Sequence, residues 1–336
     1  MKSNLMHTSW IIPSFEVGLV SVIIPTYNRV VLLEEALQSV INQTYRPVEC
    51  IVVDDGSTDH TNKLVKKYIE LNNESFTTKY IYQKNSGSQI ARNAGTLLSS
   101  GEFIQYLDSD DILYPDKISK QVQFLKANTI CDGVFGNWRT GNQLKNEMVT
   151  AYESEDMIDQ MLTGRCIHTL SFLMRRSLVE KIGPWDITLK RNQEIDYHLM
   201  GLLTGAKYCY FDHETGLHRK HSLTTITAST GLKEIHQFYV KWEKLLKENK
   251  RFPDEMKIKF ANMYLWIFGT HTQTNSATVD LLADVMRLHP NATIFSSKKL
   301  TAARKLFGTR LALRLWLSWL IYNKNKPATK VEQTRR

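Results

Sequence analysis

Three carboxylates stand within four residues, at Asp108, Asp110 and Asp111. The preceding stretch from Gly101 to Leu107 is rich in the apolar and aromatic residues that form a strand buried on both faces of a parallel sheet. In open α/β sheets, ligands bind beyond the carboxyl ends of the strands. Mg²⁺ and Mn²⁺ prefer oxygen ligands and bind through few protein carboxylates together with substrate phosphates. The spacing therefore predicts a metal–diphosphate site. The alternative is a solvated acidic turn in which Asp111 favours the start of the next helix.

Two apolar, β-branched runs earlier in the chain, residues 20–25 and 48–53, predict further buried strands. Polar residues follow both runs: Thr26, Asn28, Asp54 and Asp55. A carboxylate at a buried strand tip is costly unless a hydrogen-bond donor or a cation meets it. A pyrimidine N–H or a ribose hydroxyl would serve Asp54 or Asp55, and a metal ion would serve Asp110. Three such tips in one chain favour a nucleotide-diphosphate site.

The order of the predicted elements indicates how these tips meet. Segments with helical periodicity separate the runs at 20–25, 48–53, 80–82 and 101–107, and a further helix is expected over 115–125. This alternation requires parallel pairing with right-handed crossovers, so we predict an α/β fold with a Rossmann-like, mostly parallel sheet flanked by helices. The absence of G-x-G-x-x-G disfavours NAD or FAD, and the absence of G-x-x-x-x-G-K-[ST] excludes a P-loop NTPase.

The alternation decays in the second part of the chain. Strands are expected at 134–135, 171–174 and 207–211, and helices at 177–181 and 194–203. The remainder is predicted to be a helical C-terminal region, with helices near 231–249, 254–270, 277–288 and 298–323. We therefore divide the chain into an N-terminal extension, two halves of a sheet domain and a helical region, at 1–18, 19–125, 126–230 and 231–336.

Four blocks, in order along the chain, closely resemble the family 2 glycosyltransferases. They are Val20 to Arg29 (VSVIIPTYNR), Val53 to Asp59 (VDDGSTD), Asn85-x-Gly87 with Ala91 to Gly95 (ARNAG), and Leu107 to Asp111 (LDSDD). The resemblance is dense over 19–125 and thinner as far as Ser222. It implies an inverting enzyme with the GT-A fold, in which 19–125 forms the nucleotide-sugar half and 126–230 the acceptor half.

The resemblance also implies roles for individual residues. Thr26 and either Asp54 or Asp55 would hold the base, Arg92 and Asn93 would lie near the ribose and diphosphate, and Asp108 and Asp110 would bind the ribose and Mn²⁺ or Mg²⁺. The implied nucleotide-sugar site comprises Pro25, Thr26, Asn28, Asp54, Asp55, Asn85, Gly87, Arg92, Asn93, Asp108 and Ser109. For Arg92 the alternative is a surface cation, although its place at a helix N-terminus suits an anion.

Inverting sugar transfer also needs a base, because the acceptor hydroxyl loses its proton as the diphosphate leaves. Many family members carry a Glu-Asp pair that opens a helix, and the stretch from Asn192 to His198 resembles a Gln-Glu-x-Asp variant of it. This resemblance places the base at Glu194, with Asp196 as the second candidate. Both acids could instead be helix-start charges favoured by the macrodipole. The run from 218 to 222 resembles the family's late histidine block, which makes His221 a candidate for contact with the metal.

Composition bears on partners and compartment. The net charge of +9, from 43 basic and 34 acidic residues, is compatible with nucleic acid, an anionic membrane surface or an anionic substrate. The four cysteines, Cys50, Cys131, Cys166 and Cys209, form no C-x-x-C pair, so neither a disulfide nor a zinc site is expected and a reducing cytosol is the simpler expectation. Residues 1–18 do not resemble a signal peptide, which predicts a cytoplasmic location.

The segment 298–323 combines cations with apolar residues. A cationic stretch over 298–305 leads into an apolar stretch over 311–322, and cations on one face with tryptophan and leucine on the other suit a helix lying in the headgroup region on the inner face of a membrane. Arg314 and the short apolar run argue against a membrane span. The alternative is a helix packed on protein. Nucleic acid is not expected as a partner, since aromatics and cations do not interleave along a sheet or groove.

Together these features predict a metal-dependent, inverting glycosyltransferase. It would use a UDP-linked sugar and a glycan or lipid-linked acceptor in surface polysaccharide biosynthesis. A sugar nucleotidyltransferase would need an early glycine-rich, basic loop that the chain lacks. The alternative from another class is a catalytically silent, sugar-nucleotide-binding scaffold at a membrane surface, and turnover of the donor distinguishes the two.

Overall fold

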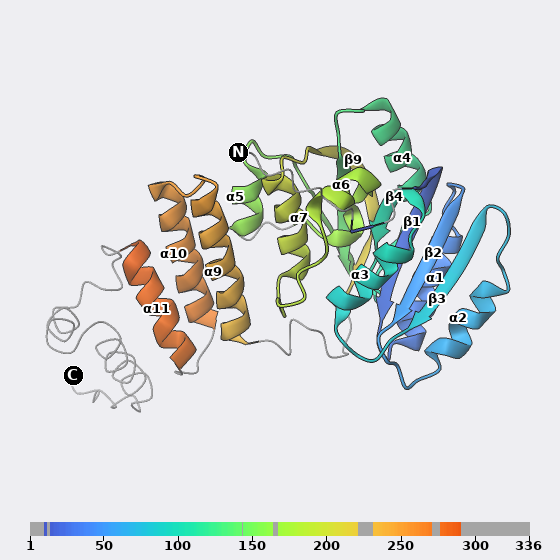
Figure 1. The fold of residues 1–336 in the computed structure, drawn as a ribbon, viewed down its shortest axis with the longest axis horizontal. Helices are drawn as coiled ribbons and strands as arrows, with labels where there is room; N and C mark the ends of the chain where they lie inside the picture. The colour runs from blue at the N-terminus through green and yellow to red at the C-terminus, as the bar shows by residue number, and fades with distance from the viewer. Residues whose placement is uncertain are drawn as a thin grey trace, which may run out of the picture. The chain divides into compact units, whose positions relative to one another are not determined.

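The chain forms two compact units, Met1–Thr225 and Ile226–Arg336. The computed structural model describes residues 10–11, 14–142, 144–163, 167–220, 231–270 and 276–289. Within the described residues the first unit contains one nine-stranded sheet with flanking helices, and the second unit is helical (Figure 1). The domain boundary predicted at residue 230 falls outside the described residues.

The first part of the sheet is parallel, as the sequence predicts. Its strands are β1 (Glu16–Thr26), β2 (Val48–Asp54), β3 (Phe76–Tyr82) and β4 (Gly101–Tyr106). β1 lies between β2 and β4, and β2 also pairs with β3. In this register Thr26 is the partner of Asp54, and the aspartates begin just beyond Tyr106. The three strand tips therefore meet at one edge of the sheet.

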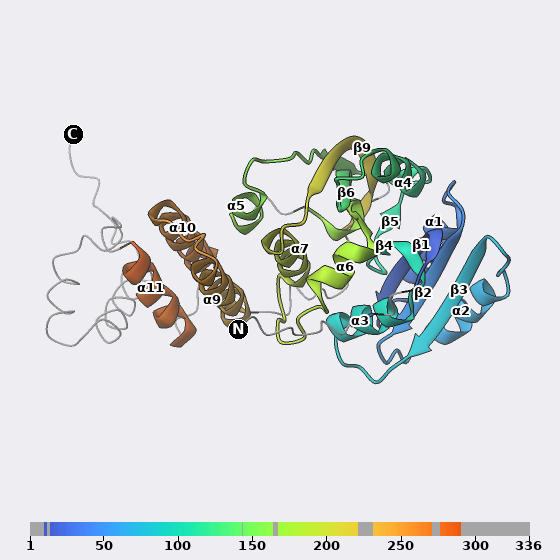
Figure 2. The ribbon, with the colours of Figure 1, turned by 45° about the horizontal axis from the view of Figure 1, so that its top comes forward.

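Four helices follow these strands: α1 (Val30–Ile41), α2 (Thr61–Ile69), α3 (Ser88–Leu98) and α4 (Lys117–Ala127). The helix α3 packs against β1 and β2. The approach is so close that a Cβ atom at Gly95 would lie 2.5 Å from Cγ2 of Ile23. Glycine at this position lets α3 sit directly on the sheet, with its N-terminus near the strand tips (Figure 2).

The second part of the sheet is mainly antiparallel and returns to the aspartates. It comprises β5 (Ile112–Leu113), β6 (Gly133–Gly141), β7 (Asn146–Val149), β8 (Leu173–Arg175) and β9 (Tyr208–Arg219). The strand order is β3-β2-β1-β4-β8-β6-β9-β5, with β7 beside β6. Because β9 is long, its end reaches β5, where Leu217 is the partner of Ile112. The last strand of this unit thus ends beside the aspartate loop.

Several element predictions for this part were incomplete. The predicted strand 171–174 is divided between a 3₁₀ turn, η1 (Thr169–Ser171), and β8, and the predicted strand 207–211 continues to Arg219. The short helix α5 (Met157–Leu162) and the strands β5 and β7 were not predicted. The predicted helices correspond to α6 (Arg176–Ile182) and α7 (Gln193–Leu203). The missed strands are short, or polar over part of their length, so they lack a clear apolar period.

The expectation that the cysteines form no disulfide was wrong. Cys131 and Cys209 form a disulfide, with their Cα atoms 6.0 Å apart. Cys131 precedes β6, and Cys209 lies in β9 opposite Val134 of β6. Parallel pairing of two strands that are distant in sequence brings the cysteines together, and their spacing along the chain could not reveal this. Cys166 lies outside the described residues, and Cys50 is a buried free thiol.

The second unit packs three helices together, α9 (Leu232–Glu248), α10 (Asp254–Thr270) and α11 (Ser276–Leu288). They confirm the helices predicted over 231–249, 254–270 and 277–288. Arg287 of α11 donates from both Nη atoms to Glu243 of α9, at 2.7 and 2.8 Å. The predicted helix 298–323 lies outside the described residues. No helix in the described part of the chain is long and apolar enough to cross a membrane.

Candidate active site

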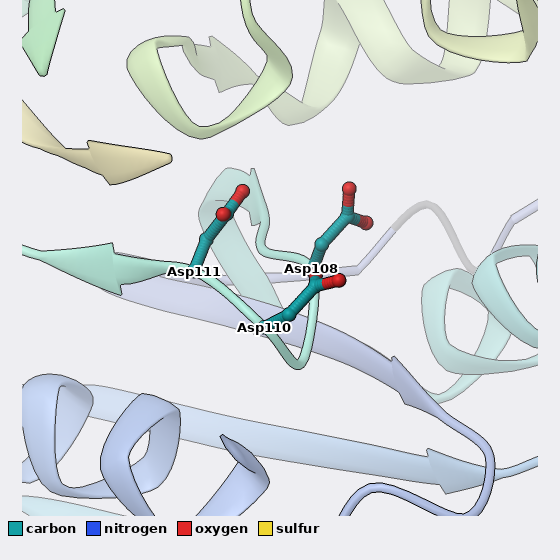
Figure 3. A group of neighbouring side chains, drawn as sticks. All are labelled: Asp108, Asp110 and Asp111. Carbon is teal, nitrogen blue, oxygen red and sulfur yellow. The ribbon is translucent and has the colours of Figure 1, made fainter. Parts of the chain in front are cut away.

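The aspartate loop after β4 brings three carboxylates together. Oxygen atoms of Asp108, Asp110 and Asp111 all lie within 4.8 Å of one another. Figure 3 shows the three side chains leaving one short loop, with Asp108 and Asp111 directed to the same side of it. Asp111 is 1% exposed, and its Oδ2 atom has no hydrogen-bond partner among the described residues. Burial and the neighbouring Asp108 and Asp110 raise the pKa of Asp111 well above its usual range.

These observations fit a divalent cation. A cluster of carboxylate oxygens with an unsatisfied buried member is the donor set that Mg²⁺ and Mn²⁺ prefer. The sequence predicted Asp108 and Asp110 as ligands and considered Asp111 as a helix-start residue, whereas the next helix, α4, is preceded by Asp116. The sequence did contain a signal that Asp111 could be a ligand, because Asp111 is the third acid of the stretch 108–111.

Two arginines from other elements contact the first two aspartates. Arg92 of α3 donates from Nη2 to Oδ1 of Asp108 at 2.6 Å. Arg29, at the end of the loop after β1, pairs with Asp110. Although burial raises the pKa of Asp108, Arg92 and its other cationic neighbours hold that pKa below the ordinary value. Arg29 was part of a quoted block but was not predicted as a site residue.

The same Nη2 atom of Arg92 also lies 3.2 Å from Oε1 of Glu194, at the start of α7. Arg92 is 2% exposed, so the alternative of a surface cation is excluded. The side chain of Glu194 is 34% exposed, whereas Asp196 is buried. Burial raises the pKa of Glu194, while Arg92 acts in the opposite direction. One guanidinium group therefore links Glu194 to the aspartate loop.

Asp54 and Asp55, at the carboxyl end of β2, accept hydrogen bonds from other groups of the protein. Asp54 accepts hydrogen bonds from Ser57 N at 2.8 Å and from the Tyr80 hydroxyl at 2.7 Å. Asp55 accepts one from Gln83 and one each from the main-chain N–H groups of Ser86 and Gly87, at 2.7 to 2.8 Å. Asp55 thus shapes the loop that carries Asn85 and Gly87. Contact of either aspartate with a base stays a prediction.

The end of β1 and the loop after it lie against these residues. Pro25 and Thr26 are the partners of Val53 and Asp54, and the buried Oγ1 of Thr26 has no hydrogen-bond partner among the described residues. Asn28 has a positive φ of 50° and accepts a hydrogen bond from Thr58 N at 2.7 Å. The Asn28 side chain therefore ties the first strand tip to the second.

The remaining predicted residues differ in their surroundings. Ser109 is buried in the aspartate loop, and Gly87 adopts a φ of 103° immediately before α3. The side chain of Asn93 binds the main chain of Trp185 in both directions, donating at 3.1 Å and accepting at 2.8 Å. A nucleotide contact for Asn93 stays a prediction. His221 lies outside the described residues.

Residues 21–183 match the model of glycosyl transferase family 2. An uncharacterised glycosyltransferase of Rickettsia typhi is 30% identical over 254 residues, which cover 68% of this chain and 72% of that protein. The chain belongs to glycosyltransferase family 2. A second relative of this transferase is the GalNAc(5)-diNAcBac-PP-undecaprenol beta-1,3-glucosyltransferase of Campylobacter jejuni, 29% identical over 71% of the chain and 77% of the relative.

The fold of this glycosyltransferase is shared with a solved structure. Residues 1–349 of S. aureus TarS, in complex with UDP-GlcNAc, match with a TM-score of 0.63 over 90% of this chain and 92% of that one, at 17% identity. The family resemblance of the four sequence blocks and the predicted GT-A fold class are both confirmed.

The second part of the transferase contributes residues that were not predicted. Arg219, at the end of β9, donates from its main-chain N–H to Asp111 at 3.1 Å and from Nε to the carbonyl of Asp110. His168 places Nδ1 3.8 Å from Oδ2 of Asp111 and stacks on His218 at 4.3 Å. Burial, with the adjacent His218, lowers the pKa of His168 to about 4. His218 and Arg219 belong to the block that suggested His221, whereas His168 had no sequence signal.

Proposed function

We propose that this glycosyltransferase is metal-dependent and inverting, and that it moves a sugar from a UDP-sugar to a hydroxyl of a glycan or lipid-linked acceptor. One observation carries the proposal: the buried Arg92 joins Asp108 to Glu194. A single guanidinium thus connects the carboxylates suited to a cation–diphosphate with the carboxylate suited to accept the acceptor's proton. Inverting transfer needs these two functions side by side.

Asp108, Asp110 and Asp111 would hold Mn²⁺ or Mg²⁺. When bound, the cation neutralises charge on the diphosphate leaving group. Arg29 and Arg92, which contact Asp110 and Asp108, would also bind the phosphate oxygens by charge-assisted hydrogen bonds. The UDP component would extend toward Thr26, Asp54 and Asp55 at the neighbouring strand tips.

Glu194 supplies the base in this mechanism. The acceptor oxygen forms a bond to the anomeric carbon while the bond from that carbon to the diphosphate oxygen breaks, and the hydroxyl proton passes to Glu194. Partial exposure leaves the Glu194 carboxylate accessible to an acceptor, and its raised pKa strengthens it as a base. Asp196 is buried and less accessible.

The relatives support the choice of donor and acceptor classes. TarS has been solved with UDP-GlcNAc and with UDP, and the Campylobacter jejuni relative is named for an undecaprenol-linked acceptor. By extension we propose a UDP-sugar donor, a lipid-linked or glycan acceptor, and a role in surface polysaccharide biosynthesis. An amphipathic segment at 298–323 would hold the enzyme peripherally on the cytoplasmic, inner face of a membrane.

A panel of UDP-sugars tests the proposal. With Mn²⁺, the wild type should release UDP from at least one donor, and Glu194→Gln should do so at least ~100-fold more slowly, the usual contribution of a positioned base. Calorimetry with UDP should show that Glu194→Gln still binds. Asp196→Asn is the matched control and should remain near wild type. Slow turnover by Asp196→Asn together with normal turnover by Glu194→Gln would make Asp196 the base. No turnover of any sugar nucleotide would favour a catalytically silent scaffold.

A further inference from the structure

Trp185 packs against Arg92, the arginine that contacts both Asp108 and Glu194. The residue is 2% exposed, and its indole stacks on the Tyr197 ring with centroids 4.2 Å apart and an interplanar angle of 7°. Tyr106 meets the indole edge-on at 5.0 Å. Tyr106 ends β4, two residues before Asp108, and Tyr197 lies on α7, three residues after Glu194. Figures 1 and 2 label both elements. The indole therefore packs against both elements that carry reacting carboxylates.

The helix α3 fixes Trp185 from the other side. Asn93 binds the Trp185 main chain through two hydrogen bonds, and the adjacent Arg92 places its guanidinium carbon 4.5 Å from the centre of the indole ring. A buried cation over an indole face is among the stronger cation–π arrangements. Consecutive residues of one helix thus hold Trp185 by its main chain and by its ring.

The hydrogen bonds of Arg92 do not define its orientation fully. Nη2 donates to both Asp108 and Glu194, Nη1 reaches Ser88 only at 3.4 Å, and Nε has no hydrogen-bond partner among the described residues. A guanidinium held mainly through one nitrogen could rotate about that contact. The indole opposes this rotation, because movement of the guanidinium carbon away from the ring would weaken the cation–π contact.

We propose that Trp185 is a positioning residue for sugar transfer. Its indole keeps the Arg92 guanidinium in the plane that serves Asp108 and Glu194 together, and so holds the base at a constant place relative to the donor. This inference rests on the proposed function, in which Glu194 is the base. The competing explanation is that Trp185 only fills the core, in which case its loss would weaken folding without acting through Arg92.

Two substitutions separate these explanations. Trp185→Leu removes the aromatic face, and Trp185→Phe keeps a smaller one. With Mn²⁺ and the UDP-sugar that wild type turns over fastest, Trp185→Leu should lower kcat ~10–30-fold with KM for the donor within ~3-fold, and Trp185→Phe should stay within ~3-fold of wild type. If Trp185→Leu does not fold, Trp185→Met provides the same comparison.

A double-mutant cycle with Arg92→Met tests whether Trp185 affects kcat through Arg92. If Trp185 acts through Arg92, Trp185→Leu should slow the Arg92→Met enzyme by less than ~3-fold further. Trp242→Leu, in the second unit, is the control: this residue is fully buried, so its loss should lower the melting temperature without lowering kcat.

Four outcomes would overturn the inference. These are equal losses in the Leu and Phe variants, losses that multiply in the cycle, an effect confined to KM, or the same fall in kcat for Trp242→Leu. Failure of the proposed function would look different, because Glu194→Gln would then match wild type. That result would show that Glu194 is not the base that Trp185 is proposed to position.

Discussion

At the scale of single residues, the site is a set of opposite charges placed on different elements. Asp108 and Asp110 each contact an arginine, from α3 and from the loop after β1, while the buried Asp111 receives the Arg219 main-chain N–H. The buried Asp111 keeps an oxygen without a hydrogen-bond partner among the described residues, although Arg29, Arg92 and Arg219 all contact this loop. A divalent cation would complete this arrangement.

Donor binding should therefore depend on the cation and on Asp110. Calorimetric titration of a UDP-sugar with Mn²⁺ should show tighter binding than titration with chelator. Asp110→Ala should lose at least ~10-fold in affinity, the order expected for one charged contact. Asp116→Ala is the control, because that carboxylate is 47% exposed and pairs with Lys120. Equal affinity in all conditions would show that the aspartate loop does not hold a cation–diphosphate.

At the scale of elements, ion pairs connect helices in the second unit. Glu243 of α9 accepts from Arg287 of α11 through both oxygens, and Asp284 on α11 pairs with His236 of α9 at 2.8 Å. Burial acts to raise the pKa of both acids, but the hydrogen bonds from Arg287, Lys247 and His236 outweigh it and lower both pKa values. Their charged forms are therefore stabilised in the folded state.

Arg287→Met should destabilise this unit in a pH-dependent way. At neutral pH we expect a loss of about 1–3 kcal/mol, below the value for a fully buried pair because Arg287 is half-exposed. Since the folded-state pKa values lie below the unfolded ones, this stability is present above the unfolded pKa values and disappears as pH falls through the folded ones. Melting followed by circular dichroism at pH 7 and pH 3 measures the difference.

The control for this prediction is Lys244→Met. Lys244 pairs with Glu248 across 3.9 Å on an exposed surface, so its loss should change stability by less than about 0.5 kcal/mol at either pH. A destabilisation by Arg287→Met that is the same at pH 7 and pH 3 would contradict the assignment to the ion pairs.

At the scale of the whole molecule, the sequence combines a transferase unit with a basic C-terminal segment. Lys298, Lys299, Arg304, Lys305 and Arg314 accompany leucine and tryptophan residues over 298–323, outside the described part of the structure. Such a composition suits attachment to an anionic surface through both charge and apolar burial. The proposed lipid-linked acceptor would be presented at that surface.

Deletion of residues 298–336 should release the enzyme from anionic vesicles without changing UDP binding. Each cation near the surface contributes about 1 kcal/mol that salt screens, whereas buried tryptophan and leucine add a contribution that salt does not screen. Co-sedimentation of the full chain with phosphatidylserine vesicles should therefore fall only in part as salt rises. No binding at low salt would mean that this segment packs on protein.

The sequence by itself determined the first part of the sheet, the family and the aspartate loop. Strand runs, turn residues and helical periods are local features, so β1 to β4 and the acids at their tips could be read from neighbouring residues. Pairing between distant residues depended on the tertiary structure. Arg92 meets Asp108 across 16 residues and Glu194 across 102, and Cys131 meets Cys209 across 78. No local pattern encodes such partners, because they become neighbours only when α3 packs on the sheet, α7 packs near the tip of β4 and β9 returns beside β6.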